Sequence, residues 1–186
     1  MARPASAMRG HILESALRLF AAGGFNGTSL HDIAADAGCS KASLIYHFST
    51  KEAILTELLT PAREELAALD AHVTGLPQDQ QVEAAVVGYV ELALRYRREV
   101  KILFEDTPVM VCNPALGDIP AMAERLVDTM SGRSRDAGRI VSANMVLGAV
   151  FVTCAGEMDI PDDVLRDELI AGALRTLGHR PDEPRG

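Results

Sequence analysis

Aromatic residues are scarce in this chain, and tryptophan is absent from it. Only 4% of its 186 residues are aromatic, although 48% are apolar. The core must therefore be packed mainly with alanine, leucine, valine and isoleucine. Glycine and proline fall mostly between segments of regular apolar spacing, a distribution typical of helices joined by short loops. We expect a helical protein whose length suffices for one or two domains with a proper core.

Clusters of catalytic or metal-binding residues are also missing. The five histidines are scattered, and no nucleophile motif, paired histidine ligands or glycine-rich phosphate loop is present. The odd number and wide spacing of Cys39, Cys112 and Cys154 indicate neither a zinc site nor a disulfide. We therefore predict that the chain is not an enzyme and holds no cofactor and no metal. A thiol- or metal-responsive protein of the same fold stays an alternative.

The sequence offers no export signal and no long hydrophobic run. The first residues, MARPASAMRGH, lack the apolar stretch of a signal peptide. The longest uncharged run covers residues 140–156, which is shorter than the ~20 residues that cross a bilayer. We expect a cytoplasmic protein with no membrane partner.

Positive charge is not in excess overall, but its distribution is uneven. The formal net charge is −8, from 18 Lys and Arg against 26 Asp and Glu. Residues 1–60 contain five basic and five acidic side chains, so the remaining residues carry 13 against 21 and account for the whole −8. Acidic charge is thus concentrated away from the N-terminal segment, where Arg3 and Arg9 either reach a flanking DNA groove or belong to a disordered tail.

Residues 28–51 have the pattern of two short helices joined by a glycine turn. The hydroxyls of Thr28 and Ser29 can accept from the free amides of a helix that begins near Leu30. Apolar residues then recur with the spacing of one buried stripe, at Leu30, Ile33, Ala34 and Ala37. Gly38 ends this helix, because glycine adopts positive φ at little cost.

The second short helix is expected over residues 41–48, with Ser40 as its N-cap. Its outer face combines a cation, small residues and polar rings, which suits a DNA groove: Lys41, Ala42, Ser43, Ile45, Tyr46 and His47. Ser49 and Glu52 have the spacing of a capping box for a third helix. Lys51 would oppose the dipole of that helix, so a phosphate partner explains it better than helix stability does.

The segment from about residue 8 to 59 resembles the N-terminal domain of the TetR family of bacterial transcriptional regulators. The motif ILESALRLFAAGGFNGTSLHDIAADAGCSKASLIYHFSTKEAIL carries the resemblance. It implies a homodimer that binds double-stranded palindromic operator DNA, represses transcription and is released by a small-molecule effector. By resemblance, the DNA-binding residues are Thr28, Ser29, Ser40, Lys41, Ala42, Ser43, Ile45, Tyr46, His47 and Lys51.

One position departs from the family pattern. Two successive aromatic residues usually precede the histidine, whereas this chain has Ile45 and then Tyr46. The change predicts either weaker phosphate anchoring or an apolar contact with a thymine methyl group. It is also the one feature that favours a helical interaction module without DNA binding, and Lys41, Tyr46, His47 and Lys51 argue against that alternative.

Beyond residue 59 the apolar spacing predicts further helices. We expect a long helix over residues 49–72, interrupted or kinked near Pro61, and later helices over 79–98, 99–106, 121–130, 137–156 and 163–177. The predicted fold is all-α, with about nine helices in total. A three-helix helix-turn-helix domain with its N-terminal arm (1–52) precedes a helical effector-binding and dimerisation domain (53–178) and a disordered tail (179–186).

The second domain holds two predicted sites. Small and apolar residues on the last two helices suit a four-helix dimer interface: Leu147, Gly148, Phe151, Ala155, Leu165, Leu169, Gly172 and Ala173. The effector is expected to be small and largely apolar, in a pocket with methionine and aromatic lining. Its candidate residues are Tyr89, Leu92, Tyr96, Leu103, Phe104, Met110, Met122, Leu126 and Met145.

Overall fold

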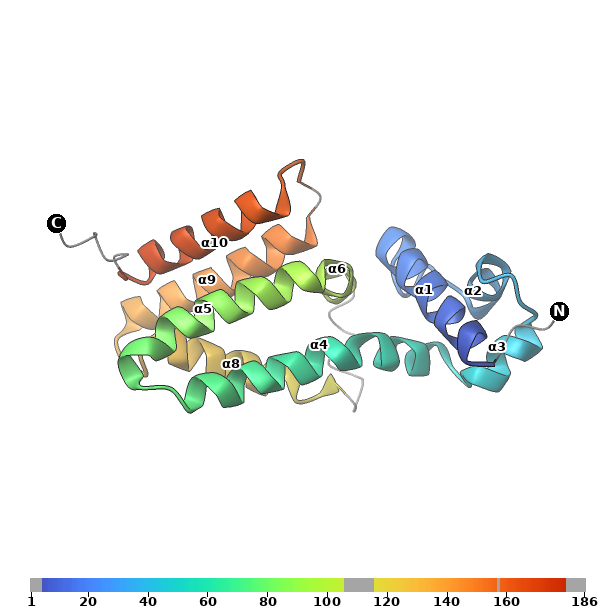
Figure 1. The fold of residues 1–186 in the computed structure, drawn as a ribbon, viewed down its shortest axis with the longest axis horizontal. Coiled ribbons are helices and arrows are strands. Elements are labelled where there is room, and N and C mark those ends of the chain that lie inside the picture. The colour runs from blue at the N-terminus through green and yellow to red at the C-terminus, as the bar shows by residue number, and fades with distance from the viewer. Residues whose placement is uncertain (1–4, 106–115, 157, 180–186) are drawn as a thin grey trace. The chain divides into compact units, whose positions relative to one another are not determined.

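The structure is a computed structural model, and it describes residues 5–105, 116–156 and 158–179. Within these ranges the chain forms nine α-helices and no strand (Figure 1). The predicted all-α fold is therefore confirmed. The predicted helices after residue 59 lie within a few residues of the observed ones.

Internal contacts divide the chain into two compact units, residues 1–61 with 98–117, and residues 62–97 with 118–186. The sequence places a domain boundary after residue 52, whereas the contacts change at Pro61. Pro61 lies inside one continuous helix, α4 (Lys51–Thr74), which contributes to both units. The expected interruption near Pro61 therefore does not end the helix.

The first unit is built on α1 (Ala5–Gly23), which buries Ile12, Ala16 and Phe20 along one face. These residues follow the four-residue spacing of a single helical stripe. The Phe20 ring lies 5.1 Å from the Phe25 ring, measured between centroids, and this contact fixes the turn that follows α1.

Two short helices complete the motif predicted from the sequence. In α2 (Leu30–Asp36), Ser29 and Asp32 form a reciprocal capping box. Gly38 follows with a φ of 67°, the left-handed conformation that lets the chain turn directly into the next helix. Ser40 then caps α3 (Lys41–His47) by accepting from the amide of Ser43.

The start of α4 differs from the sequence-based prediction. The hydroxyl of Thr50 accepts from the amide of Ala53 at 3.1 Å, so Thr50 provides the cap. The capping box predicted from Ser49 and Glu52 was therefore wrong by one residue, because Thr50 offers an equivalent hydroxyl at the position where the helix begins.

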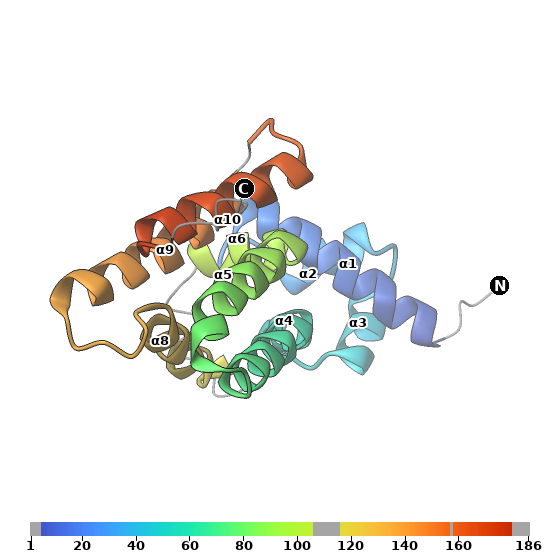
Figure 2. The ribbon, with the colours of Figure 1, turned by 60° about the vertical axis from the view of Figure 1, so that its left-hand side comes forward.

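The second unit packs its remaining helices around α5 (Gln78–Arg95). This helix contacts α8 (Ile119–Met130), α9 (Ala137–Ala155) and α10 (Asp162–Thr176), and Figures 1 and 2 both show α9 and α10 side by side. Buried aliphatic side chains join these helices, among them Val86, Val90, Leu126 and Val150. Their burial supplies the main stabilisation of this unit.

Arginine ion pairs cross the surface of the second unit. Arg63 binds Asp118, Arg125 binds Asp70 at 2.6 Å, and Arg166 binds Glu91 at 2.6 Å. These pairs are solvent-exposed, so each contributes only about 0–1 kcal/mol to stability. They align neighbouring helices more than they stabilise them.

Candidate functional site

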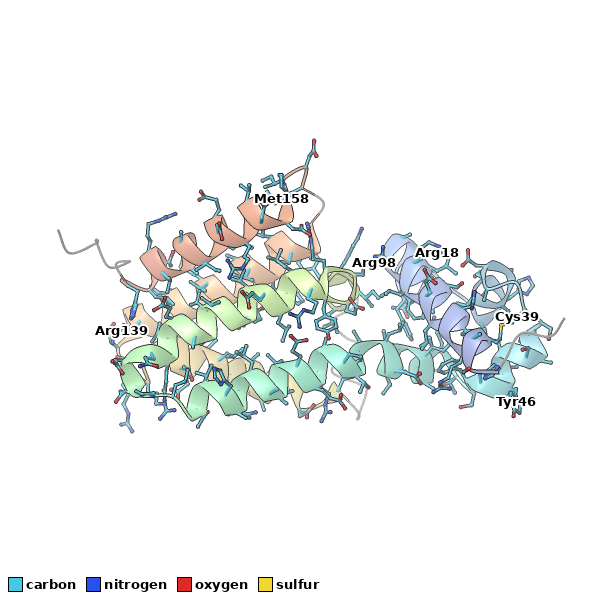
Figure 3. The ribbon with its side chains drawn as sticks, in the orientation of Figure 1. Arg18, Cys39, Tyr46, Arg98, Arg139 and Met158 are labelled. Atoms are coloured by element: carbon cyan, nitrogen blue, oxygen red, sulfur yellow. The ribbon has the colours of Figure 1, made fainter. Side chains whose placement is uncertain are left out.

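The outer face of α3 is largely exposed. The Tyr46 side chain is 83% exposed and that of Ile45 is 46% exposed. Figure 3 shows Tyr46 projecting from the end of α3 into solvent. Ser40, Lys41 and Ala42 are exposed as well, while Ser43 and His47 are half-buried. The predicted face thus presents a cation, small residues and a ring at one surface.

The rings of Tyr46 and His47 meet edge to face, with centroids 5.2 Å apart and planes at 78°. The contact orients Tyr46 without burying it, so its hydroxyl stays available to a partner. On the inner side of α3, Leu44 and Phe48 are buried and hold the helix against its unit. The outer face is therefore held rigidly by a packed inner face.

Arg9 fixes the C-terminal end of α3, a role that the sequence did not reveal. Its guanidinium pairs with both carboxylate oxygens of Glu57 and donates to the carbonyl oxygen of His47 at 3.2 Å. It also lies 4.4 Å from the centroid of the Phe48 ring. Arg9 belongs to the scaffold rather than to a free arm. Arg3 lies outside the described residues.

Lys51 is likewise engaged inside the unit. Its ammonium group donates to the carbonyl oxygens of Phe25 at 2.6 Å and Thr28 at 2.9 Å, and it lies 4.2 Å from the centroid of the Phe25 ring. These contacts explain a lysine at a helix N-terminus, so the structure does not require the phosphate partner inferred from the sequence.

Thr28 is 6% exposed, and its hydroxyl donates to the carbonyl oxygen of Gly24 at 2.9 Å. Ser29, the next residue, is exposed and caps α2 through the amide of Asp32 at 3.2 Å. The sequence analysis assigns both Thr28 and Ser29 to helix capping and to DNA binding. Only the hydroxyl of Ser29 caps the helix and lies at the surface.

Acidic groups near the motif are held ionised by internal partners. Hydrogen bonds from the hydroxyl and the amide of Ser29 lower the pKa of Asp32. A hydrogen bond with Ser15, together with Arg18, lowers the pKa of Asp36. Lys41, by contrast, has no acidic partner within the part of the chain that the structure describes. Lys41 therefore provides uncompensated positive charge on the outer face of α3.

Two helices crossing at a glycine turn, the second with its outer face free, define a helix-turn-helix DNA-binding domain. Residues 12–58 match the family described as "Bacterial regulatory proteins, tetR family". The transcriptional regulator RutR of Escherichia coli strain K12 is 32% identical over 180 residues, which cover 92% of this chain and 82% of RutR. The chain belongs to the TetR family of bacterial transcriptional regulators.

A further sequence relative and two solved structures of the same fold are also similar to this chain. IcaR, a negative transcriptional regulator of a biofilm operon in Staphylococcus aureus strain Newman, is 45% identical over 47 residues, 25% of each chain. KstR2 of Mycobacterium tuberculosis shares the fold at a TM-score of 0.75, with 19% identity and coverage of 94% of this chain and 95% of that one. AibR, solved with isovaleryl coenzyme A and operator DNA, gives a TM-score of 0.64 at 22% identity, covering 89% and 97%.

These findings confirm the family and the functional class predicted from the sequence, a DNA-binding transcriptional regulator. The homologues are regulators rather than enzymes. Among the described residues, no group of three or more His, Cys, Asp or Glu side chains is placed to hold a metal ion.

The thiols have raised pKa values. Burial raises the pKa of Cys39, which is half-buried beside the turn, and more complete burial raises that of Cys154 in α9. Both thiols stay protonated at neutral pH and are poor nucleophiles, which weakens the alternative of a thiol-responsive regulator. Cys112 lies outside the described residues.

The residues predicted to line the effector pocket are not all brought together. Tyr89 and Leu92 on α5 and Met122 and Leu126 on α8 are buried in the second unit, where these two helices are in contact. The hydroxyl of Tyr89 donates to the carbonyl oxygen of Leu147 at 3.3 Å, and burial raises its pKa. These four predicted residues are thus buried on two helices that contact each other.

The other predicted pocket residues differ in exposure and in the unit to which they belong. Tyr96 follows α5 and is half-buried. Leu103 and Phe104 belong to α6 (Arg97–Glu105) in the first unit, and Phe104 is 48% exposed. Met145 is 60% exposed on α9, because its helical position faces solvent rather than α5. Met110 lies outside the described residues.

The residues predicted for the dimer interface fall on two sides of α9 and α10. Ala155, Leu165 and Ala173 are buried within the protomer. Gly148 is exposed, and Leu147, Phe151, Leu169 and Gly172 are half-buried. The large apolar side chains exposed beside these residues on the two helices include Val141, Met145, Val152 and Val164. The dimer interface itself stays a prediction.

This exposed surface gives α9 an unusual composition for a surface helix. Ala137–Ala155 is long and apolar enough to cross a membrane by length and composition alone, and only 22% of its most apolar window is buried. One such helix is weak evidence for a membrane span. Exposed apolar helix faces are also typical of protein–protein interfaces.

Proposed function

We propose that this protein is a cytoplasmic, homodimeric transcriptional repressor that reads one major-groove half-site per subunit with the outer face of α3. The observation that carries the proposal is the exposure of Ile45 and Tyr46 on a helix whose inner face is locked by Leu44 and Phe48. Because a rigid helix loses little entropy on binding, such a face suits direct contact with base edges.

The proposed contacts divide into two kinds. Lys41 and the hydroxyls of Ser29, Ser40 and Tyr46 would contact phosphates, which position the helix without reading sequence. Ala42, Ser43, Ile45 and His47 would face base edges. Ile45 would supply an apolar contact with a thymine methyl group, which is displayed only in the major groove.

Dimerisation would set the spacing of two half-sites. A two-fold symmetric dimer presents two α3 helices to a palindrome whose half-sites are about one helical turn apart, roughly 34 Å, or a multiple of it. The exposed apolar side of α9 and α10 is the proposed dimer surface. Effector binding would favour an arrangement of subunits in which this spacing is lost.

A small, largely apolar molecule is the proposed effector. The buried group around Tyr89, Leu92, Met122 and Leu126 offers aliphatic, sulfur and aromatic surface with one hydroxyl. AibR, which has the same fold, binds an acyl coenzyme A together with operator DNA. That complex supports the proposal that one chain of this fold couples the two ligands.

Selection from a random duplex pool tests the DNA-binding proposal. We expect the full-length protein to enrich a palindrome with half-sites spaced by about one turn. The Tyr46→Ala protein serves as a matched control, because it alters the proposed reading face and leaves the packed inner face unchanged. Enrichment of no motif by the parent protein, or of the same motif with equal yield by Tyr46→Ala, would overturn the assignment of this face.

A further inference from the structure

One face of α9 is apolar and uncovered along its length. Val141, Met145 and Val152 are 55%, 60% and 52% exposed, and Gly148 lies between them on the same face. The spacing of these four positions alternates between four and three residues, as in the seam between two packed helices. No charged side chain occurs from residue 140 to 155.

The middle of this face is hollowed by glycine. A Cβ atom added at Gly148 would meet nothing within 4 Å, so the protomer itself does not require a glycine there. Its neighbour Ala149 lines a groove of about 260 Å³ between α9 and α10, together with Gly172. Gly148 and Gly172 therefore lie at about the same level of the two helices, where a partner can approach closely.

Two opposite charges lie on either side of Gly172 along α10. Glu168 and Arg175 are exposed and lie seven residues apart, which is about two helical turns or ~10.5 Å along one face. Within the part of the chain that the structure describes, neither forms an ion pair, although Arg166 on the same helix binds Glu91. The midpoint between Glu168 and Arg175 falls between Ala171 and Gly172.

We propose that a second copy of this chain packs on α9 and α10 with its two-fold axis at the level of Gly148 and Gly172. In this antiparallel arrangement, Glu168 of each subunit pairs with Arg175 of the partner subunit. The inference rests on the homodimer of the proposed function and adds its register. Symmetry supports it, because an isologous interface needs a self-complementary surface, and an acid and a base equidistant from the axis provide one.

Charge reversal tests the register. In a homodimer of the Glu168→Arg variant, both symmetry-related pairs of residues 168 and 175 carry like charges. The same is true of a homodimer of the Arg175→Glu variant. We expect each single variant to raise the dimer dissociation constant by about tenfold or more, measured by analytical ultracentrifugation at low salt. The double variant Glu168→Arg/Arg175→Glu restores opposite charges and should return to within about threefold of the parent value.

Mixing the two single variants gives the sharpest readout. A heterodimer of Glu168→Arg with Arg175→Glu has two complementary contacts, while each homodimer has none. We expect native mass spectrometry of the mixture to show mainly heterodimer. Random pairing of the two variants would instead make heterodimers half of all dimers. Glu83→Arg is the matched control, since it makes the same charge change at an exposed position of α5, and its mixture with the parent should stay statistical.

A steric variant tests the level of the axis separately. Gly148→Leu fits the isolated protomer and replaces glycine by a better helix former, so circular dichroism should show an unchanged fold. We expect it to weaken the dimer by about tenfold or more, whereas Gly10→Leu, also at an open helical position, should not. If the parent is a dimer but the two charge variants pair at random, the proposed register is wrong and the homodimer stands. A parent that is monomeric at tens of micromolar would instead refute the proposed homodimer.

Discussion

The ammonium group of Lys51 donates to the carbonyl oxygen of Phe25 at 2.6 Å and lies 4.2 Å from the centroid of the ring of that same residue. A second bond to the carbonyl oxygen of Thr28 ties the start of α4 to the turn before α2. These residues are more than twenty positions apart in the sequence. The lysine therefore joins segments that must be aligned before α3 can present its outer face.

Replacing Lys51 should cost stability. Lys51→Met removes two charge-assisted hydrogen bonds and a cation–π contact while keeping the aliphatic stem, and we expect the free energy of unfolding to fall by about 1–3 kcal/mol. Urea denaturation followed by circular dichroism measures the change. Lys41→Met is the control and should stay within about 0.5 kcal/mol of the parent, because Lys41 is exposed. Equal stability of all three proteins would show that the contacts of Lys51 do not stabilise the fold.

Tyr46 should matter for DNA and not for the fold. At 83% exposure it contributes little to packing, so Tyr46→Ala should leave the unfolding midpoint and the dimer unchanged. We expect operator affinity to fall by about 10- to 100-fold, equivalent to about 1–3 kcal/mol. Fluorescence anisotropy with a labelled operator checks this result. An unchanged affinity would show that Tyr46 does not contact the DNA.

Ile45 should read thymine methyl groups. Ile45→Ala is expected to weaken operator binding by about 1 kcal/mol, and replacing the contacted thymine by uracil in the DNA should weaken the parent by a similar amount. If both changes remove the same contact, their combination should cost no more than either alone. Additive losses in this double-variant cycle would show that Ile45 contacts something other than the methyl group.

Asp32 should contribute to acid sensitivity. Its capping bonds with Ser29 lower its pKa below the ordinary 3.8, so the native state favours the ionised form. This contribution is fully present above pH 3.8 and is lost as the pH falls through the lower native pKa. We expect Asp32→Asn to flatten the loss of stability below about pH 4. Identical acid profiles for the two proteins would contradict the capping role.

The local signals in the sequence were sufficient for the helix-turn-helix. Gly38 and Ser40 act on their immediate neighbours, so the turn and the start of α3 follow from chemistry within a few residues. The exposed outer face of α3 followed from the helical period alone. The family then confirmed the class of function.

Contacts between distant segments could not be predicted in the same way. Arg9 meets Glu57 and Phe48 only because α1 crosses the end of α3, and no spacing in the sequence indicates that crossing. Met145 was assigned to the effector pocket because methionine suits such pockets, yet its place on α9 is decided by which side of that helix faces α5. The choice between Ser49 and Thr50 as a cap depended on a one-residue shift in where α4 begins.

Binding of the parent protein to the DNA upstream of its own gene, beside a scrambled duplex of equal length and at several salt concentrations, tests the central claim most directly. We expect a preference of about 1000-fold or more for the native duplex and a steep fall of affinity with salt. Lys41→Met should reduce the salt slope by about one. Equal, weak binding to both duplexes, with the same salt slope for Lys41→Met, would contradict the claim that α3 reads DNA sequence there.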